Sequence, residues 1–123
     1  MGMTLPLTAV AALAAVLLTP AHAGATAPPT GGDCSAGELC LWEGSGFEGK
    51  RHVYELSGTD IESCVALPEG VSAQALANRT GRPVTAYQSA ECAETGEFQT
   101  YPGSGTWAPQ SPYKVRAFKV WER

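Results

Sequence analysis

The residues of this sequence that are best suited to covalent chemistry are its four cysteines, Cys34, Cys40, Cys64 and Cys92. In an oxidising compartment, an even number of cysteines in a short chain is typical of a disulfide framework. Three pairings are possible, and of these we favour Cys34–Cys40 with Cys64–Cys92. In the chain-entropy description of a cross-link, the longer loop stabilises the fold by about 3.6 kcal/mol and the shorter one by about 2.4 kcal/mol.

Metal binding and catalysis are the other chemistries that these residue types could support. A zinc site would need CxxC pairs or several histidines, and His52 is the single histidine after residue 23. As a catalytic base, His52 would need a nucleophile held beside it, but no GxSxG motif accompanies it. We therefore expect no catalytic residue, no metal and no cofactor, and predict that the protein is not an enzyme.

The first 23 residues predict a signal peptide. An apolar run of 14 positions from Leu5 to Leu18 is followed by a small-x-small pattern ending at Ala23, and this run is too short to span a bilayer about 30 Å thick. Residues 24–33 contain no large apolar side chain, which favours a flexible leader. We therefore expect a secreted, extracellular protein whose folded domain covers residues 34–123.

Charge indicates which partners are excluded. Eight basic and twelve acidic residues are scattered along the chain and give a net charge of −4. Such a balance favours solubility and argues against binding to nucleic acid or to an anionic membrane. We expect neither partner, and we expect a monomer.

The elements that must position the cysteines are predicted to be strands. From Cys34 onward, short segments of alternating polarity are separated by Gly, Pro and Ser, a pattern typical of an all-β domain. One helical turn is expected near Thr59–Ser63, with Thr59 or Asp60 as its N-cap. The predicted strands are Leu39–Glu43, Lys50–Leu56, Ala73–Arg79, Pro83–Ser89, Glu97–Tyr101 and Lys114–Glu122.

An internal repeat organises these strands. The spacing from Gly49 to Tyr54 recurs from Gly96 to Tyr101, at an offset of 47 residues. Two further matches keep the same order, at offsets of 45 and 42: Leu41-Trp42-Glu43 with Ala86-Tyr87-Gln88, and Ala73-x-Ala75-Leu76 with Val115-x-Ala117-Phe118. Two units of about 45 residues, each with roughly four short strands, predict two Greek keys packed as a sandwich.

One hairpin motif in the first unit is more specific. Trp42 is followed by Phe47 and then by Gly49, a spacing in which the two aromatic rings pack on each other and the glycine adopts a positive φ. This motif resembles the hairpin signature of the βγ-crystallins. In the second unit, Cys92 and Glu94 stand where the second aromatic residue and the glycine are expected.

Two further features accompany this motif: the spacing of Cys34 and Cys40, and a return strand within residues 71–80. Together they make residues 34–123 similar to the Streptomyces metalloproteinase inhibitor family. This resemblance implies a disulfide-stapled, βγ-crystallin-like sandwich of two Greek-key units. It also implies a function, the inhibition of thermolysin-type zinc endopeptidases by occupation of their cleft, with a secreted metalloendopeptidase as the partner. Crystallin units often bind calcium, but segments 68–73 and 109–113 offer a single carboxylate, Glu69, so no calcium site is expected.

An inhibitor of this kind must present a rigid, substrate-like bond beside a disulfide. We favour the bond between Cys64 and Val65, because a β-branched apolar residue suits an apolar S1′ pocket and the segment lies in a long loop. The alternative is the bond between Cys92 and Ala93. Either cysteine could instead be a purely structural staple.

A rival function is a secreted crystallin-type binding or antimicrobial module that recognises cell-wall or glycan surfaces. Its binding platform would be formed by Trp42, Trp107 and Trp121, although tryptophans in strands usually belong to the core. The glycosylation sequon at Asn78 falls in a predicted strand, which favours a structural role for this asparagine.

Overall fold

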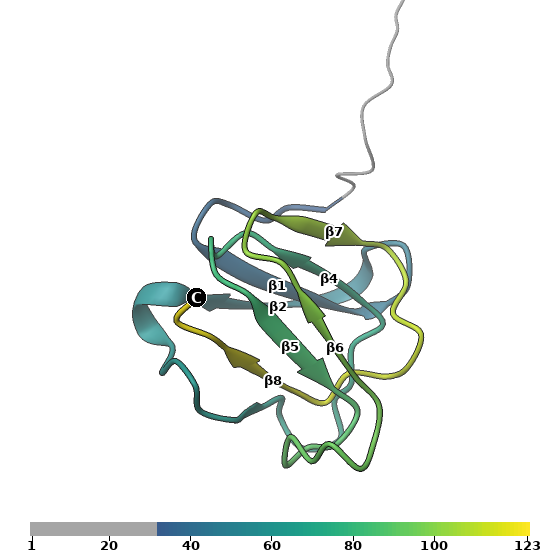
Figure 1. The fold of residues 1–123 in the computed structure, drawn as a ribbon. Coiled ribbons are helices and arrows are strands. Elements are labelled where there is room, and N and C mark those ends of the chain that lie inside the picture. The colour runs from purple at the N-terminus through teal and green to yellow at the C-terminus, as the bar shows by residue number, and fades with distance from the viewer. Residues whose placement is uncertain (1–31) are drawn as a thin grey trace, which may run out of the picture.

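Residues 32–123 are described by the computed structural model, and they form two antiparallel four-stranded sheets that lie as two layers (Figure 1). The predicted signal peptide and residues 24–31 of the predicted leader lie outside the described residues. No helix among residues 32–123 is long and apolar enough to cross a membrane. The strands are β1 (Glu38–Gly44), β2 (Glu48–Glu55), β3 (Val65–Ala66), β4 (Ala75–Asn78), β5 (Val84–Tyr87), β6 (Phe98–Tyr101), β7 (Thr106–Ala108) and β8 (Ala117–Val120).

All six predicted strands are found, with ends that differ by at most three residues. Two short strands, β3 and β7, were not predicted. The helical turn was predicted at the wrong place, because the described turn is a 3₁₀ helix over Leu56–Gly58 and Thr59 follows it as the C-cap. The Thr59 hydroxyl donates back to the carbonyl of Glu55, so neither Thr59 nor Asp60 acts as an N-cap.

The order of strands confirms the internal repeat. One sheet has the order β2-β1-β4-β7 and the other β3-β8-β5-β6. If each of the strands β1 to β4 is exchanged with the strand four places later, β5 to β8, the strand order of one sheet becomes that of the other. The register agrees as well, since Leu41 lies opposite His52 and Ala86 lies opposite Gln99, at offsets of 45 and 47 residues.

A pseudo-twofold axis passes beside Ala73 and Val115. These two residues correspond to each other in the repeat, and each donates its N–H to the carbonyl of the other at 2.8 Å. Around this axis the third strand of each half joins the sheet of the other half: β3 pairs with β8, and β7 pairs with β4. The two halves are therefore interlocked through their main chains.

The main core lies between the sheets and is formed by alternate residues of their inner faces. Its largest fully buried members include Leu39, Leu41, Leu76, Val84, Phe118 and Val120. Asn78 is also fully buried, and its side-chain amide donates to the carbonyls of Arg82, Tyr101 and Pro102. This asparagine ties two loops to β4, which confirms that it is structural.

A second, smaller core covers the outer face of β1. Trp42 packs edge-on against Phe47, with ring centroids 5.0 Å apart, and Phe47 in turn packs against Trp107 at 5.9 Å. Gly49 has a φ of +81°, and a Cβ there would lie 3.2 Å from the nitrogen of Gly44. The predicted hairpin, with packed aromatics and a left-handed glycine, is confirmed.

The corresponding hairpin of the second half keeps part of this geometry with different residues. Cys92 follows Tyr87 by five residues, as Phe47 follows Trp42. Both Phe47 and Cys92 are left-handed, with φ values of 60° and 58°. A disulfide-bonded sulfur therefore replaces the second aromatic ring at the same place in the repeat.

Four tyrosines give the fold a predicted sensitivity to alkali. Burial raises the pKa of Tyr113 far above its ordinary value of 10.0, with further contributions from nearby tyrosine and glutamate side chains, and the Tyr113 hydroxyl donates to the carbonyl of Ala86 at 2.7 Å. Burial also raises the pKa of Tyr54, Tyr87 and Tyr101. Because the folded-state pKa values exceed the unfolded one, this contribution to stability is complete below pH 10.0 and is lost as the pH rises above it.

Urea unfolding followed by tryptophan fluorescence, at pH values on either side of 10.0, measures this loss. The unfolding midpoint is expected to fall above pH 10.0 and to fall less steeply in Tyr113→Phe, which lacks one titrating group. A midpoint that stays constant through this range would contradict the prediction.

Candidate functional site

Both predicted disulfides are present. Cys34 bonds to Cys40 and Cys64 bonds to Cys92, and the Cα atoms are 5.9 Å apart in each pair. The first bridge closes the short loop that leads into β1. The second joins the segment before β3 to the loop between β5 and β6, so it connects the two places at which a presented bond was predicted.

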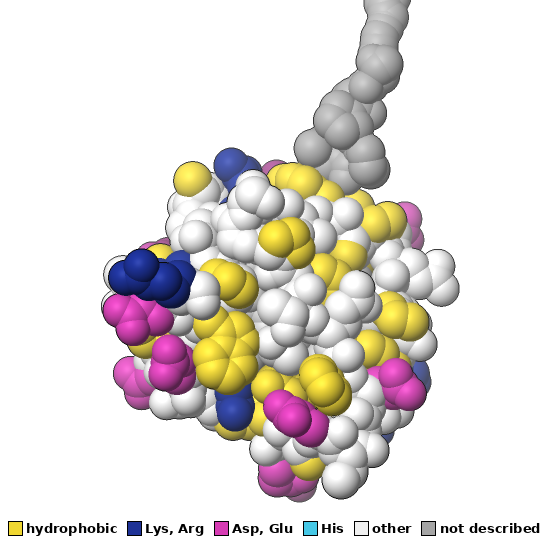
Figure 2. Space-filling view, in the orientation of Figure 1, with side chains coloured by type: hydrophobic (Ala, Val, Ile, Leu, Met, Phe, Trp, Pro, Cys, Tyr) yellow, Lys and Arg dark blue, Asp and Glu magenta, His cyan; other side chains and the backbone are white. Residues whose placement is uncertain are grey.

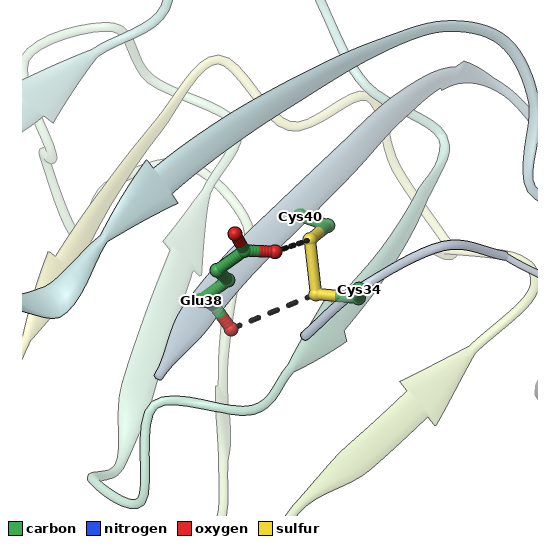
Figure 3. Close-up of side chains that lie close together, drawn as sticks. All are labelled: Cys34, Glu38 and Cys40. Atoms are coloured by element: carbon green, nitrogen blue, oxygen red, sulfur yellow. Dashed lines mark hydrogen bonds between the residues drawn. A yellow bond between two sulfur atoms is a disulfide. The ribbon is translucent and has the colours of Figure 1, made fainter. Parts of the chain in front are cut away.

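The Cys34–Cys40 bridge lies against the side chain of Glu38 (Figure 3). A carboxylate oxygen of Glu38 is 3.7 Å from the Cys40 sulfur. Two sulfurs and a carboxylate within 4.8 Å would be a possible metal-ligand set, but sulfurs bonded to each other have neither a thiolate nor a hydrogen to offer. We interpret these contacts as packing around a structural bridge.

The segment before Cys64 is exposed and is fastened at two points. Residues 62–64 are all exposed. The N–H of Glu62 donates to the carbonyl of Val120 at the end of β8, over 2.6 Å, and the disulfide holds Cys64 two residues later. Glu62 itself is left-handed, with a φ of 60°, so the chain turns sharply just before it reaches the cysteine.

Val65 begins β3, which is an edge strand of its sheet. It pairs with Phe118 on one side and has no strand on the other side among residues 32–123. Its side chain is half-buried and packs against the main core, whereas the following Ala66 is exposed. The bond between Cys64 and Val65 thus joins an exposed residue to a partly accessible one.

The alternative bond has a different geometry. Cys92 is only 8% exposed and packs with Tyr87 and Ala117, and its φ of 58° places it in the left-handed region. Peptidases bind substrates as extended segments, in which φ is negative. The conformation of Cys92 therefore fits a substrate-like role less well than the exposed Cys64 does.

The other candidate residues are dispersed over the molecule. His52 lies on β2 and contacts the carboxylate of Glu43 at 2.8 Å. Trp42 and Trp107 flank Phe47 on one sheet, whereas the ring nitrogen of Trp121 donates to the Thr85 hydroxyl on the other. The three tryptophans accordingly do not form one platform.

Sequence reasoning did not anticipate the anchor formed by Glu62. Left-handed backbone is most common at Gly, Asn and Asp, and a glutamate gives no such signal. The acceptor, Val120, is 58 residues further along the chain, so only the folded arrangement of β3 and β8 brings the two together.

Comparison with known families decides the biochemical class. Residues 27–101, more than half of the chain, match the model of peptidase inhibitor family I36. The chain belongs to this family. Family I36 includes the Streptomyces metalloproteinase inhibitor, so the resemblance found in the sequence is confirmed at the level of the family. No curated protein and no solved structure matches the chain significantly.

Membership of family I36 confirms that the protein is a peptidase inhibitor and not an enzyme. Its partner is therefore a peptidase. An inhibitor needs an ordered segment that the peptidase can bind, and the segment at Cys64 is both exposed and fastened.

Proposed function

We propose that this protein is a secreted, monomeric inhibitor of thermolysin-type zinc endopeptidases that presents the bond between Cys64 and Val65 as a substrate-like segment. The observation that carries the proposal is the exposed Cys64, which a disulfide holds at the start of an edge strand. Membership of family I36 supports the inhibitory role, and the resemblance to the Streptomyces metalloproteinase inhibitor supports zinc endopeptidases as targets.

The edge position of β3 suits binding in a peptidase cleft. An extended segment binds there by adding its main chain to an edge strand of the enzyme, and one edge of β3 has no partner strand among residues 32–123. Because the disulfide and the Glu62 anchor already order the segment, little conformational entropy is lost on binding.

The same connections explain why cleavage would be unproductive. If the enzyme hydrolysed the bond, the new end at Cys64 would stay attached through its disulfide, and Val65 would stay paired with Phe118. The two ends would remain in the cleft at a high effective concentration. Resynthesis of the bond would then compete with release.

We also propose that the two sheets form a βγ-crystallin-like pair of Greek keys. In each half, the fourth strand lies beside the first and the third strand joins the opposite sheet, which supports this assignment. Two disulfides support secretion, since such bonds persist in oxidising compartments.

Titration of the mature chain against a thermolysin-type endopeptidase, a serine peptidase and a cysteine peptidase tests the function. We expect stoichiometric inhibition of the zinc enzyme, measured with a peptide substrate. If the zinc enzyme retains full activity while one of the others is inhibited, the target class is wrong. If none of the three enzymes is inhibited at micromolar inhibitor, the proposed function is wrong.

Mass spectrometry of the denatured, unreduced complex identifies the presented bond. A nick after Cys64 leaves the two fragments joined by the Cys64–Cys92 disulfide. The mass of the unreduced protein therefore increases by one water, and the two fragments separate only on reduction. A nick after Cys92 releases a fragment from Ala93 onward, which contains no cysteine, without reduction. The second pattern would transfer the site to the alternative bond.

A further inference from the structure

An exposed basic pair, Lys114 and Arg116, lies next to the proposed segment. Within residues 32–123, neither side chain makes a salt bridge or a hydrogen bond. Three other cations are engaged: Arg79 and Arg82 donate to main-chain carbonyls, and Lys119 lies over two aromatic rings. This pair is therefore available for a partner.

The pairing of β3 with β8 places Lys114 and Arg116 on the carboxyl side of the presented bond. The N–H of Leu67 donates to the carbonyl of Arg116 at 2.9 Å, so Arg116 lies beside the second residue after Val65. A groove of about 450 Å³ runs between residues 67–72 and the segment before β8, with Lys114 and Arg116 on one side. Its other lining residues are residues 67–72, which include Glu69, and Ala90 of the β5–β6 loop.

Acidic residues precede the bond and flank the disulfide partner of Cys64. Asp60 and Glu62 precede Cys64, and Glu91 and Glu94 flank Cys92, which the disulfide holds against it. All four carboxylates are exposed. Figure 2 shows the molecule from the β5–β6 side, with acidic side chains at its lower end and others at its left and right edges. The residues that precede the bond thus carry two negative charges, whereas the groove that follows it is lined by two positive charges and the single carboxylate of Glu69.

We infer that Lys114 and Arg116 form a secondary contact with the inhibited peptidase, by pairing with carboxylates on its rim beyond the subsites that take Val65 and Ala66. This inference rests on the proposed function. The net charge of the protein is −4. Lys114 and Arg116 would therefore attract an acidic rim only at short range, and this local attraction would orient the inhibitor. Charges at the edge of an interface act mainly on the association rate, and salt screens them over about 10 Å at 0.1 M.

Stopped-flow measurement of association with the zinc endopeptidase tests the inference. The double variant K114Q/R116Q is expected to associate about 5-fold to 10-fold more slowly at low ionic strength, with a dissociation rate near that of the wild type. The difference should disappear at high salt. The control variant K50Q removes one exposed charge, against two in the double variant, from β2 in the other sheet and should stay within about 2-fold of the wild type.

The outcomes separate the two proposals. If the wild-type protein inhibits no zinc endopeptidase, the proposed function fails. If it inhibits but K114Q/R116Q associates as fast as the wild type or faster, the secondary contact is refuted and the function stands. An equal slowing in K50Q would attribute the effect to net charge and would also refute the contact.

Discussion

Removal of the long disulfide by C64S/C92S is expected to lower the free energy of unfolding by about 3.6 kcal/mol. The two cysteines are 28 positions apart, so the cross-link removes many conformations from the unfolded chain. A second effect is expected on inhibition. Without the bridge, the new end at Cys64 would be held only by the hydrogen bond from Glu62 to Val120, and the Val65 end by the pairing of β3 with β8, so the variant should be consumed as a substrate.

Urea unfolding provides the measurement, and C34S/C40S is the control. Its seven-residue loop predicts a smaller loss of about 2.4 kcal/mol, with inhibition retained. Since Cys34 and Cys40 contribute to the small core around Trp42, the packing of that core should change in this variant, whereas C64S/C92S changes the contacts of Cys92 with Tyr87 and Ala117. A larger loss in C34S/C40S than in C64S/C92S would show that packing, and not loop length, decides the order.

Substitution of Val65 by aspartate is expected to raise the inhibition constant by at least about 100-fold. A carboxylate in an apolar pocket of the peptidase loses its hydration without gaining a partner, at a cost of several kcal/mol. The matched substitution at the alternative bond, Ala93→Asp, should change the constant by less than about 3-fold, because Ala93 would then lie outside the cleft. Both constants come from steady-state inhibition of the zinc endopeptidase.

Stability must be measured in the same variants, because Val65 also packs against the main core. Val65→Thr nearly preserves the shape and the preference for a strand, and it should raise the constant by about 10-fold while the unfolding midpoint stays close to that of the wild type. If Val65→Asp is folded and inhibits normally while Ala93→Asp does not, the presented bond is Cys92–Ala93.

The parts of the fold that the sequence predicted are those with their own local pattern. β1 and β5 are continuous runs of buried residues that contribute alternately to the main core and to the smaller clusters, and the repeat places them 45 residues apart. β3 has only two residues, and it exists because Phe118 and Ala117 of β8 offer it a partner. β7 likewise depends on β4. Such strands are determined by contacts distant in the sequence, so their own residues carry little signal.

The candidate site likewise has some features with a local sequence pattern and others that depend on contacts distant in the sequence. The even number of cysteines predicted two disulfides, and of the three possible pairings the favoured one is present. The packed aromatic hairpin was predicted from the positions of Trp42, Phe47 and Gly49. The half-buried state of Val65 and the freedom of Lys114 and Arg116 were not predictable, because each depends on which segments meet in space. Burial of Cys92 has the same origin, since its neighbours are Tyr87 and Ala117 from two different strands.

The exchange of third strands between the halves constrains how such a chain could arise or be divided. A single unit of about 45 residues would have a third strand without a place in its own sheet, and only another copy of the same unit would supply that place. The reciprocal bonds between Ala73 and Val115 lie where the axis of such a homodimer would pass. The present chain is thus equivalent to a fused dimer, and two fragments separated at the tip between β4 and β5 would each be incomplete until they reassociated.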